Sequence, residues 1–138
     1  MLESAIATAA KAHEGQTDKA GKPYILHPLR VMLNVKCCIP EQCAAVLHDV
    51  IEDTDITAEA LLELGFSKEV VDAVVLLTRS KDEDYMEYVK RLKANPIARA
   101  VKLADLADNM DMSRIPNPTE KDLARLEKYK KAKSILLG

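Results

Sequence analysis

The sequence predicts a single all-α domain of seven or eight helices, spanning residues 1–138. Three observations support this. Apolar residues recur at helical spacing in nearly every segment, and Gly and Pro residues fall between these segments. No segment shows the alternation typical of a strand. Aromatic residues are scarce, with no Trp, one Phe and four Tyr, so the core must consist of Leu, Val, Ile, Ala and Met, a mixture that suits packed helices.

Proline positions mark the helices of the first half. The first predicted helix covers residues 2–13 and ends at the Gly-containing stretch GQTDKAGKPY. Pro28 fits the first turn of the second helix, HPLRVMLNVK, because the N–H that proline lacks would have no partner there. Pro40 has the same place in the third helix, PEQCAAVLHDVIED, which we expect to run unbroken over residues 40–53.

Capping residues mark the helices of the second half. Thr57 and Ser67 are the expected N-caps of two helices separated at Gly65, and the Ser67 cap favours a helix for the apolar run VVDAVVLL. Two more helices are predicted in DEDYMEYVKRLKA and IARAVKLADLADNM. Thr119 caps the last helix, TEKDLARLEKYKKAKSILL, with Asp122 three residues on, close to a capping box.

Composition narrows the class of protein. The net charge of −2 gives no reason to expect binding to a nucleic-acid polymer or an anionic membrane. No apolar run approaches the roughly 20 residues that span a bilayer, and the first residues do not resemble a signal peptide. The three cysteines, Cys37, Cys38 and Cys43, form no paired framework, so we expect free thiols in a reducing cytoplasm.

The stretch AAVLHDVIEDTDIT contains the densest group of polar side chains. His48 and Glu52 are four residues apart, as are Asp49 and Asp53. On a continuous helix these four side chains would share one arc. Three carboxylates packed together repel one another, and a divalent cation supplies the charge that they lack. A single His-Asp pair is nevertheless a weak signal, because such pairs arise by chance.

Two other stretches strengthen the case for a metal. His27 in KPYILHP lies at a loop-to-helix junction, and Asp105 in VKLADLADNM lies on the apolar side of its helix, where a carboxylate needs a partner. Alone, His27 also fits a core or capping histidine, and Asp105 also fits an ion pair with Lys102. Together they complete a set of two nitrogen and two oxygen ligands, which suits Mn²⁺ while leaving other divalent ions open; the set is His27, His48, Asp49 and Asp105.

The motifs HxGQ, KxGxPYxxHP, LHDxxEDT and VKLADxxxN follow one another in this chain. In this order they resemble the HD-domain hydrolases of the Rel/Spo type, in the small stand-alone form. The resemblance implies a helical fold with one Mn²⁺ at the four residues named above. It also implies hydrolysis of guanosine tetra- or pentaphosphate at the 3′ position, with release of pyrophosphate.

The resemblance assigns roles to further residues. Glu52 and Asp53 match the pair that activates water, which agrees with the chemistry, because a metal lowers the pKa of a bound water and a nearby carboxylate can take the proton. The residues that match substrate contacts are Lys19, Tyr24, Asn109, Arg125 and Tyr129. For Arg125 and Tyr129 an ordinary surface helix is the alternative. His13 matches a histidine outside the metal set and is expected to be structural.

Three departures from the family affect the expected substrate. Asp18 stands where the family has an arginine that holds the guanine base, and Asp108 and Asp111 replace residues of the family's KLADRLHNMR, so we expect a more acidic nucleotide pocket. The chain stops at Gly138, so no synthetase domain is expected to follow. Several cations remain to balance phosphate charge, namely Lys19, Lys22, Arg30, Arg79, Arg114 and Arg125.

Two alternatives to guanosine tetraphosphate hydrolysis stay open. Asp18 favours an enzyme that uses the same site to remove a 2′- or 3′-phosphate, for example from NADPH. A sensor could bind a nucleotide in this pocket without hydrolysing it, although such a module has little need of both Glu52 and Asp53.

Overall fold

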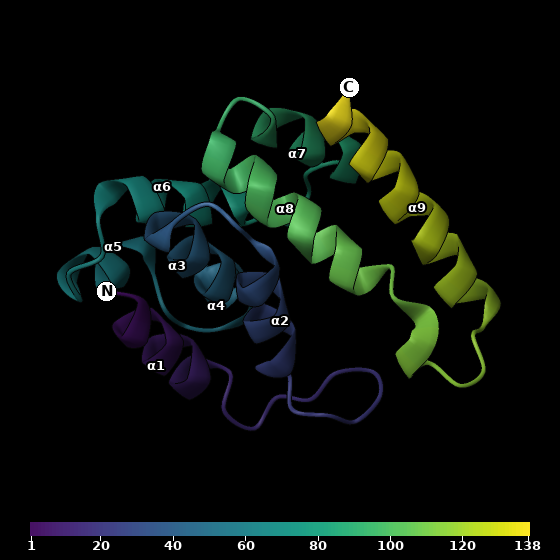
Figure 1. The fold of residues 1–138 in the computed structure, drawn as a ribbon, viewed down its shortest axis with the longest axis horizontal. Helices are drawn as coiled ribbons and strands as arrows, with labels where there is room; N and C mark the ends of the chain where they lie inside the picture. Colours follow the sequence, from purple (N-terminus) through teal and green to yellow (C-terminus); the bar gives the residue numbers. More distant parts are fainter.

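Nine α-helices and one 3₁₀ helix form the protein in the computed structural model, which describes residues 1–138 (Figure 1). The all-α prediction is confirmed. The helices are α1 (Leu2–Ala12), α2 (Leu26–Asn34), α3 (Ile39–Leu47), α4 (Val50–Asp53), α5 (Ala58–Glu63), α6 (Lys68–Leu77), α7 (Tyr85–Leu92), α8 (Pro96–Asn109), η1 (Met112–Arg114) and α9 (Glu120–Leu137). None of them is both long and apolar enough to cross a lipid bilayer.

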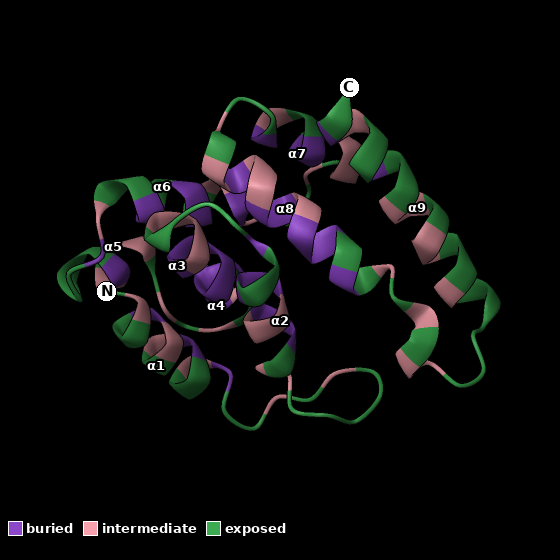
Figure 2. Ribbon diagram, in the orientation of Figure 1, coloured by how far each residue is buried: buried purple, intermediate pink, exposed green.

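Helix α3 lies at the centre of the core. It contacts α1, α2, α6 and α8, and every residue from Cys43 to Leu47 is buried. The small side chains of Ala44 and Ala45 let neighbouring helices approach closely, while Val46 and Leu47 fill the space between them. Figure 2 shows that α3 and α8, like α6, carry many of the buried residues. The packed core therefore fixes the C-terminal ends of α3 and α8, where the polar side chains lie.

The third predicted helix is not continuous, and this expectation was wrong. Helix α3 ends at Leu47, and α4 begins at Val50. The cause is local: Nδ1 of His48 lies 2.6 Å from the Ala45 carbonyl oxygen, the acceptor that a continuous helix would offer to the Asp49 N–H. The turn at His48 and Asp49 separates these two side chains from the helical face that includes Glu52. This division raises the number of helices to nine.

The connection between α1 and α2 forms one edge of the site. It contains an isolated bridge between Thr17 and Pro23, and Gly21 has a φ of +78°, which a side chain would strain. The Asp18 carboxylate accepts hydrogen bonds from the backbone N–H groups of Ala20 and Lys22, at 2.9 Å each. Asp18 therefore stabilises its own loop.

Helix α9 forms the opposite edge. The predicted capping box between Thr119 and Asp122 is confirmed, as are the N-caps at Thr57 and Ser67. The buried residues of α9, Ala132 and Leu136, both lie in its C-terminal half, where the helix packs on α7 and α8. Its N-terminal half is free of buried residues and borders a cavity.

Candidate metal centre and nucleotide pocket

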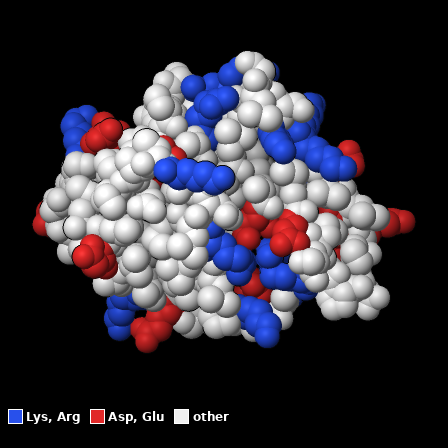
Figure 3. All heavy atoms as spheres, viewed as in Figure 1, with Lys and Arg blue, Asp and Glu red and all other residues white.

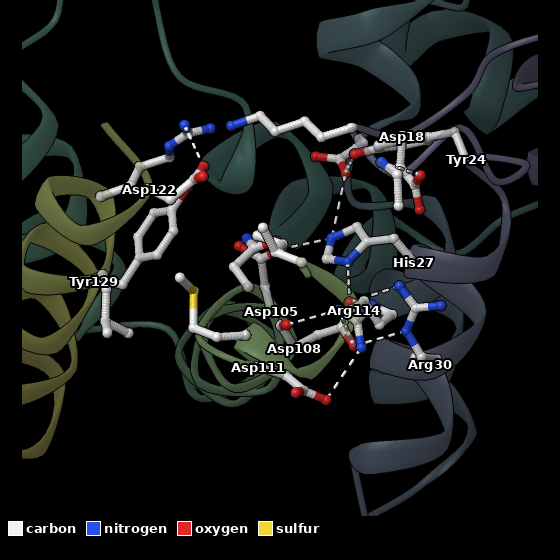
Figure 4. A pocket seen from close by; sticks show the side chains of 18 of the residues that line it. Asp18, Tyr24, His27, Arg30, Asp105, Asp108, Asp111, Arg114, Asp122 and Tyr129 are labelled. Carbon is white, nitrogen blue, oxygen red and sulfur yellow. Dashed lines mark hydrogen bonds and ion pairs between the residues drawn. The ribbon is translucent and has the colours of Figure 1, made fainter. Parts of the chain in front are cut away.

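A cavity of about 510 Å³ lies between the α1–α2 connection, α2, α8 and α9. Tyr24 and His27 face it from one side, Tyr129 and Asp122 from the other, and Asp105 lies between them (Figure 4). Acidic and basic side chains gather side by side over this part of the surface (Figure 3). A cavity of this size accommodates a ligand as large as a nucleotide.

The predicted metal ligands converge at the base of this cavity. The ligand atoms of His27, His48 and Asp105 all lie within 4.8 Å of one another, and all three residues are buried. Oδ1 of Asp105 is 2.8 Å from Nε2 of His27 and 3.3 Å from Nε2 of His48. Oδ2 of Asp49 is 3.1 Å from Nε2 of His48. The ion pair between Asp105 and Lys102, expected as the alternative to a metal role, also forms. Nζ of Lys102 lies 2.9 Å from Oδ2 of Asp105.

The histidine rings are held with Nε2 facing the carboxylates. His48 donates from Nδ1 to the Ala45 carbonyl, and its buried Nε2 has no hydrogen-bond partner. Burial alone would lower the pKa of His48, but Asp49 and Asp105 raise it well above its ordinary value. A positive charge is therefore favoured at this point, and a divalent cation could supply it in place of a proton. His27, His48 and Asp105 thus fit a divalent metal.

Asp108 orients His27 from the far side. Its Oδ2 is 2.6 Å from Nδ1 of His27, so the ring donates there and directs Nε2 toward Asp105. Arg30 donates to both Asp108 oxygens, at 2.7 and 3.1 Å, and Arg114 lies 3.5 Å from the carboxylate. Asp108 lines the pocket, and its buried negative charge is offset by these two arginines, so the expectation of a more acidic pocket stays a prediction. Asp111 is exposed and forms an ion pair with Arg114.

Replacing Asp108 with Asn should weaken divalent-metal binding about 10- to 100-fold, the usual cost of losing a carboxylate behind a histidine ligand. The neutral amide no longer favours the His27 tautomer that directs a lone pair into the site. Calorimetric titration with Mn²⁺ measures the affinity, and a thermal melt checks folding. Asp111→Asn is the matched control, because Asp111 is exposed and contacts no predicted ligand. An Asp108→Asn variant with wild-type affinity would refute this role.

The two predicted water-handling residues lie at the rim of the same cavity. Oε1 of Glu52 accepts a hydrogen bond from the Arg79 backbone N–H at 2.8 Å, which fixes this carboxylate. Partial burial and the charges of Asp49 and Glu52 raise the pKa of Asp53 to about 6. Asp53 is therefore suited to accept a proton near neutral pH.

The predicted substrate residues are also brought to this cavity, although some are already engaged. Lys19, Tyr24, Asn109, Arg125 and Tyr129 all line it. The Tyr24 hydroxyl donates to Asp49, Asn109 donates to Asp105 at 3.2 Å, and Arg125 pairs with Asp122 at 3.1 Å. Tyr24 and Asn109 thus contact predicted metal ligands directly. His13 is buried beside Tyr24, with their ring centroids 5.1 Å apart, as befits a structural residue.

Sequence reasoning missed two features of the site. The contact between Asp108 and His27 joins residues 81 positions apart, and no local pattern indicates it. Lys128 lines the cavity one residue before Tyr129, yet it was not among the candidate cations. The helical spacing of three residues from Arg125 to Lys128 could have identified it.

Comparisons with known proteins show the family to which this chain belongs. The family model described as HD domain matches residues 5–131. A Vibrio cholerae protein named guanosine-3′,5′-bis(diphosphate) 3′-pyrophosphohydrolase is 36% identical over 122 residues, covering 79% of this chain. The Escherichia coli bifunctional (p)ppGpp synthase/hydrolase SpoT is 35% identical and covers the same share. The chain spans only 17% of the length of each of these two relatives.

A solved structure is similar over nearly the whole chain. It is described as a metazoan ortholog of SpoT that hydrolyses ppGpp. The TM-score is 0.84 at 25% sequence identity, and the match covers 99% of this chain and 85% of the other. The structural similarity therefore extends over the α1–α2 connection and α9, which form the two edges of the cavity.

Proposed function

Because the chain belongs to the HD-domain family, we propose that it is a metal-dependent phosphohydrolase whose substrate is guanosine 3′,5′-bis(diphosphate) or a closely related nucleotide. The observation that supports this most is the buried Nε2 of His48, which faces two carboxylates and has no hydrogen-bond partner. The names of the similar proteins from Vibrio cholerae and Escherichia coli support the choice of substrate.

The proposed metal is Mn²⁺, held by His27, His48, Asp49 and Asp105. When bound, such an ion lowers the pKa of water and stabilises charge that develops on phosphate. Tyr24 orients Asp49 through its hydroxyl. Asp108 orients His27, and Lys102 balances the Asp105 charge that is not shared with the metal.

Glu52 and Asp53 are proposed to act on the attacking water in different ways. One oxygen of Glu52 is held by the Arg79 N–H, so the other is free to orient the water. Asp53 has no comparable donor and has a raised pKa, so it is the proposed proton acceptor. Asn109 is proposed to contact the nucleotide while its amide stays beside Asp105. Arg125 is proposed to contact the nucleotide in place of its present partner, Asp122.

The pH dependence of hydrolysis tests the role of Asp53. An acceptor must be ionised, so kcat/KM should fall about tenfold per pH unit below its pKa and level off above it. Because a bound cation favours the ionised form, the midpoint should lie at or below about 6, the value for Asp53 without the ion. Asp53→Asn should remove this acid limb together with most of the rate. An unchanged limb in the variant would contradict the assignment.

Product analysis on a panel of phosphorylated nucleotides with Mn²⁺ tests the proposed reaction. We expect pyrophosphate from guanosine 3′,5′-bis(diphosphate). Orthophosphate from a 2′- or 3′-monophosphate would favour the phosphatase alternative. That alternative was motivated by Asp18, whose carboxylate is engaged by its own loop. Tight nucleotide binding without any product would favour a sensor.

A further inference from the structure

The Glu52 carboxylate is oriented by a segment that lies outside the cavity. Glu52 is exposed, and its side chain makes one hydrogen bond, in which Oε1 accepts from the Arg79 backbone N–H at 2.8 Å. Neither Arg79 nor its chain neighbours line the cavity. A long exposed side chain has many rotamers, so a single hydrogen bond fixes it only if the donor is itself held still. Glu52 is thus only as well placed as the Arg79 N–H.

Arg79 shares one peptide group with Thr78. The C=O of this group belongs to Thr78 and the N–H to Arg79, and the peptide bond is trans. In a planar trans peptide the C=O and N–H point in opposite directions, so a partner that holds the Thr78 carbonyl also sets the direction of the Arg79 N–H. That partner is Arg91 on α7, whose Nη2 donates to the Thr78 carbonyl at 3.2 Å. The planar group therefore links Arg91 to Glu52.

Arg91 is held by three further hydrogen bonds. Its Nη1 donates to the Leu76 carbonyl at 2.7 Å, and its Nε and Nη2 donate to the two oxygens of Glu83 at 2.7 and 2.9 Å. The guanidinium carbon also lies 5.1 Å from the centroid of the Tyr88 ring. A bidentate pair between arginine and carboxylate fixes direction as well as distance. The Arg91 guanidinium is therefore a fixed point at the end of α6.

Glu83 holds the α6–α7 loop, residues 78–84, from its other end. Its Oε1 also accepts from the Ser80 backbone N–H at 3.3 Å, and its backbone carbonyl accepts from Nε of Arg79 at 2.9 Å. The polar groups on both sides of the Arg79 N–H are thus engaged by Arg91 and Glu83. The Arg79 N–H itself is left to leave the loop and reach Glu52.

We propose that Arg91 is a positioning residue for hydrolysis, which orients Glu52 through the peptide group between Thr78 and Arg79. This inference rests on the proposed function, in which Glu52 orients the attacking water. Arg91 does not line the cavity, so its effect on the reaction passes through Glu52. Loss of Arg91 should therefore lower kcat and leave both KM and the affinity for the metal unchanged.

Arg91→Lys tests the inference, with Tyr88→Phe as the matched control. Lysine keeps the charge but lacks the planar fork that engages Glu83 and the Thr78 carbonyl together. Tyr88 also donates from α7 to the end of α6, but to the Leu77 carbonyl at 2.6 Å, which belongs to the preceding peptide group. Both variants should lower the melting temperature, whereas only Arg91→Lys should lower kcat, by about tenfold. An unchanged kcat in Arg91→Lys, or an equal fall in Tyr88→Phe, would overturn the inference.

A double-mutant cycle tests whether Arg91 acts through Glu52. In single turnovers with Mn²⁺-saturated protein, Arg91→Lys should slow the Glu52→Gln variant by less than about twofold, because the residue through which it acts is already altered. A further tenfold fall in that background would contradict the proposal. Glu83→Gln is a second variant that weakens the same anchor, because glutamine cannot accept from Arg91 with both of its terminal atoms. It should lower kcat in the wild-type background and not in Glu52→Gln, and the reverse pattern would count against Arg91.

Amide NMR separates failure of this inference from failure of the proposed function, because it requires no turnover. The protein is measured with Mg²⁺, since Mn²⁺ would broaden the signals. The Arg79 amide proton should move upfield in Glu52→Gln, because a charged acceptor forms the stronger hydrogen bond. This response should be lost in the Arg91→Lys background and kept in Tyr88→Phe. If the wild-type chain hydrolyses no nucleotide, the proposed function fails, and this response alone decides the inference. A response of equal size with and without Arg91 would overturn it.

Discussion

Asp49→Ala should abolish both divalent-metal binding and nucleotide hydrolysis. Burial would raise the pKa of Asp49, but the adjacent His48 lowers it to about 2, so the carboxylate is ionised and available as a ligand. Its removal leaves the proposed set with one carboxylate, Asp105, which is already shared with Lys102. A divalent ion would then face two imidazoles and one partly neutralised oxygen ligand.

Metal titration and steady-state kinetics measure the two losses in the same preparation. Asp55→Ala is the matched control, because Asp55 is an exposed carboxylate with no ion pair in the loop after α4. The control should keep wild-type affinity and rate. Circular dichroism should show that Asp49→Ala stays helical, since Asp49 lies in the turn between α3 and α4 and outside the apolar core. Full activity after loss of the metal would refute the proposed metal centre.

Glu52→Gln should keep the metal and slow hydrolysis by about 10²-fold, the usual cost of misplacing a reacting group. Glutamine has the same shape and retains an oxygen that can accept the Arg79 N–H, so the local fold should persist. The uncharged amide orients the attacking water poorly, while Asp53 remains available as the proton acceptor. The expected pattern is thus unchanged metal affinity with a much lower kcat.

Single-turnover kinetics with the metal-saturated variant isolate the chemical step from binding. Glu59→Gln, an exposed change on α5 without contacts to the cavity, provides the control. An unchanged rate in Glu52→Gln would remove this residue from the mechanism. A loss of metal affinity instead would place Glu52 among the ligands.

Much of the fold could be predicted from local chemistry. Proline in the first turn, Ser and Thr caps, and apolar spacing each act over a few residues, so the helices in Lys68–Leu77 and Glu120–Leu137 could be located from the sequence. The break after Leu47 could not. It depends on the His48 side chain competing for the Ala45 carbonyl, and periodicity does not indicate such competition.

The candidate site likewise has residues that could be predicted from the sequence and contacts that could not. The metal-ligand set could be proposed because three motifs, each weak alone, occur together in one chain; the fold does bring its members together, namely His27, His48, Asp49 and Asp105. The pairing of Asp108 with Arg30 and His27 depends on how α2 packs against α8. From the sequence alone, Asp108 could therefore be interpreted only as an added negative charge. Lys102 on α8 and Lys128 on α9 likewise can be seen to share the Tyr85 ring only once α7, α8 and α9 are positioned.

The central claim is that this HD-domain chain uses a divalent metal to release pyrophosphate from a nucleotide. Its most direct test is pyrophosphate release from guanosine 3′,5′-bis(diphosphate), first with protein stripped by a chelator and then after Mn²⁺ is restored. We predict no release from the stripped protein. With Mn²⁺ restored, pyrophosphate and guanosine 5′-diphosphate should form in equal amounts. Equal rates with and without the metal, or orthophosphate as the product, would contradict the claim.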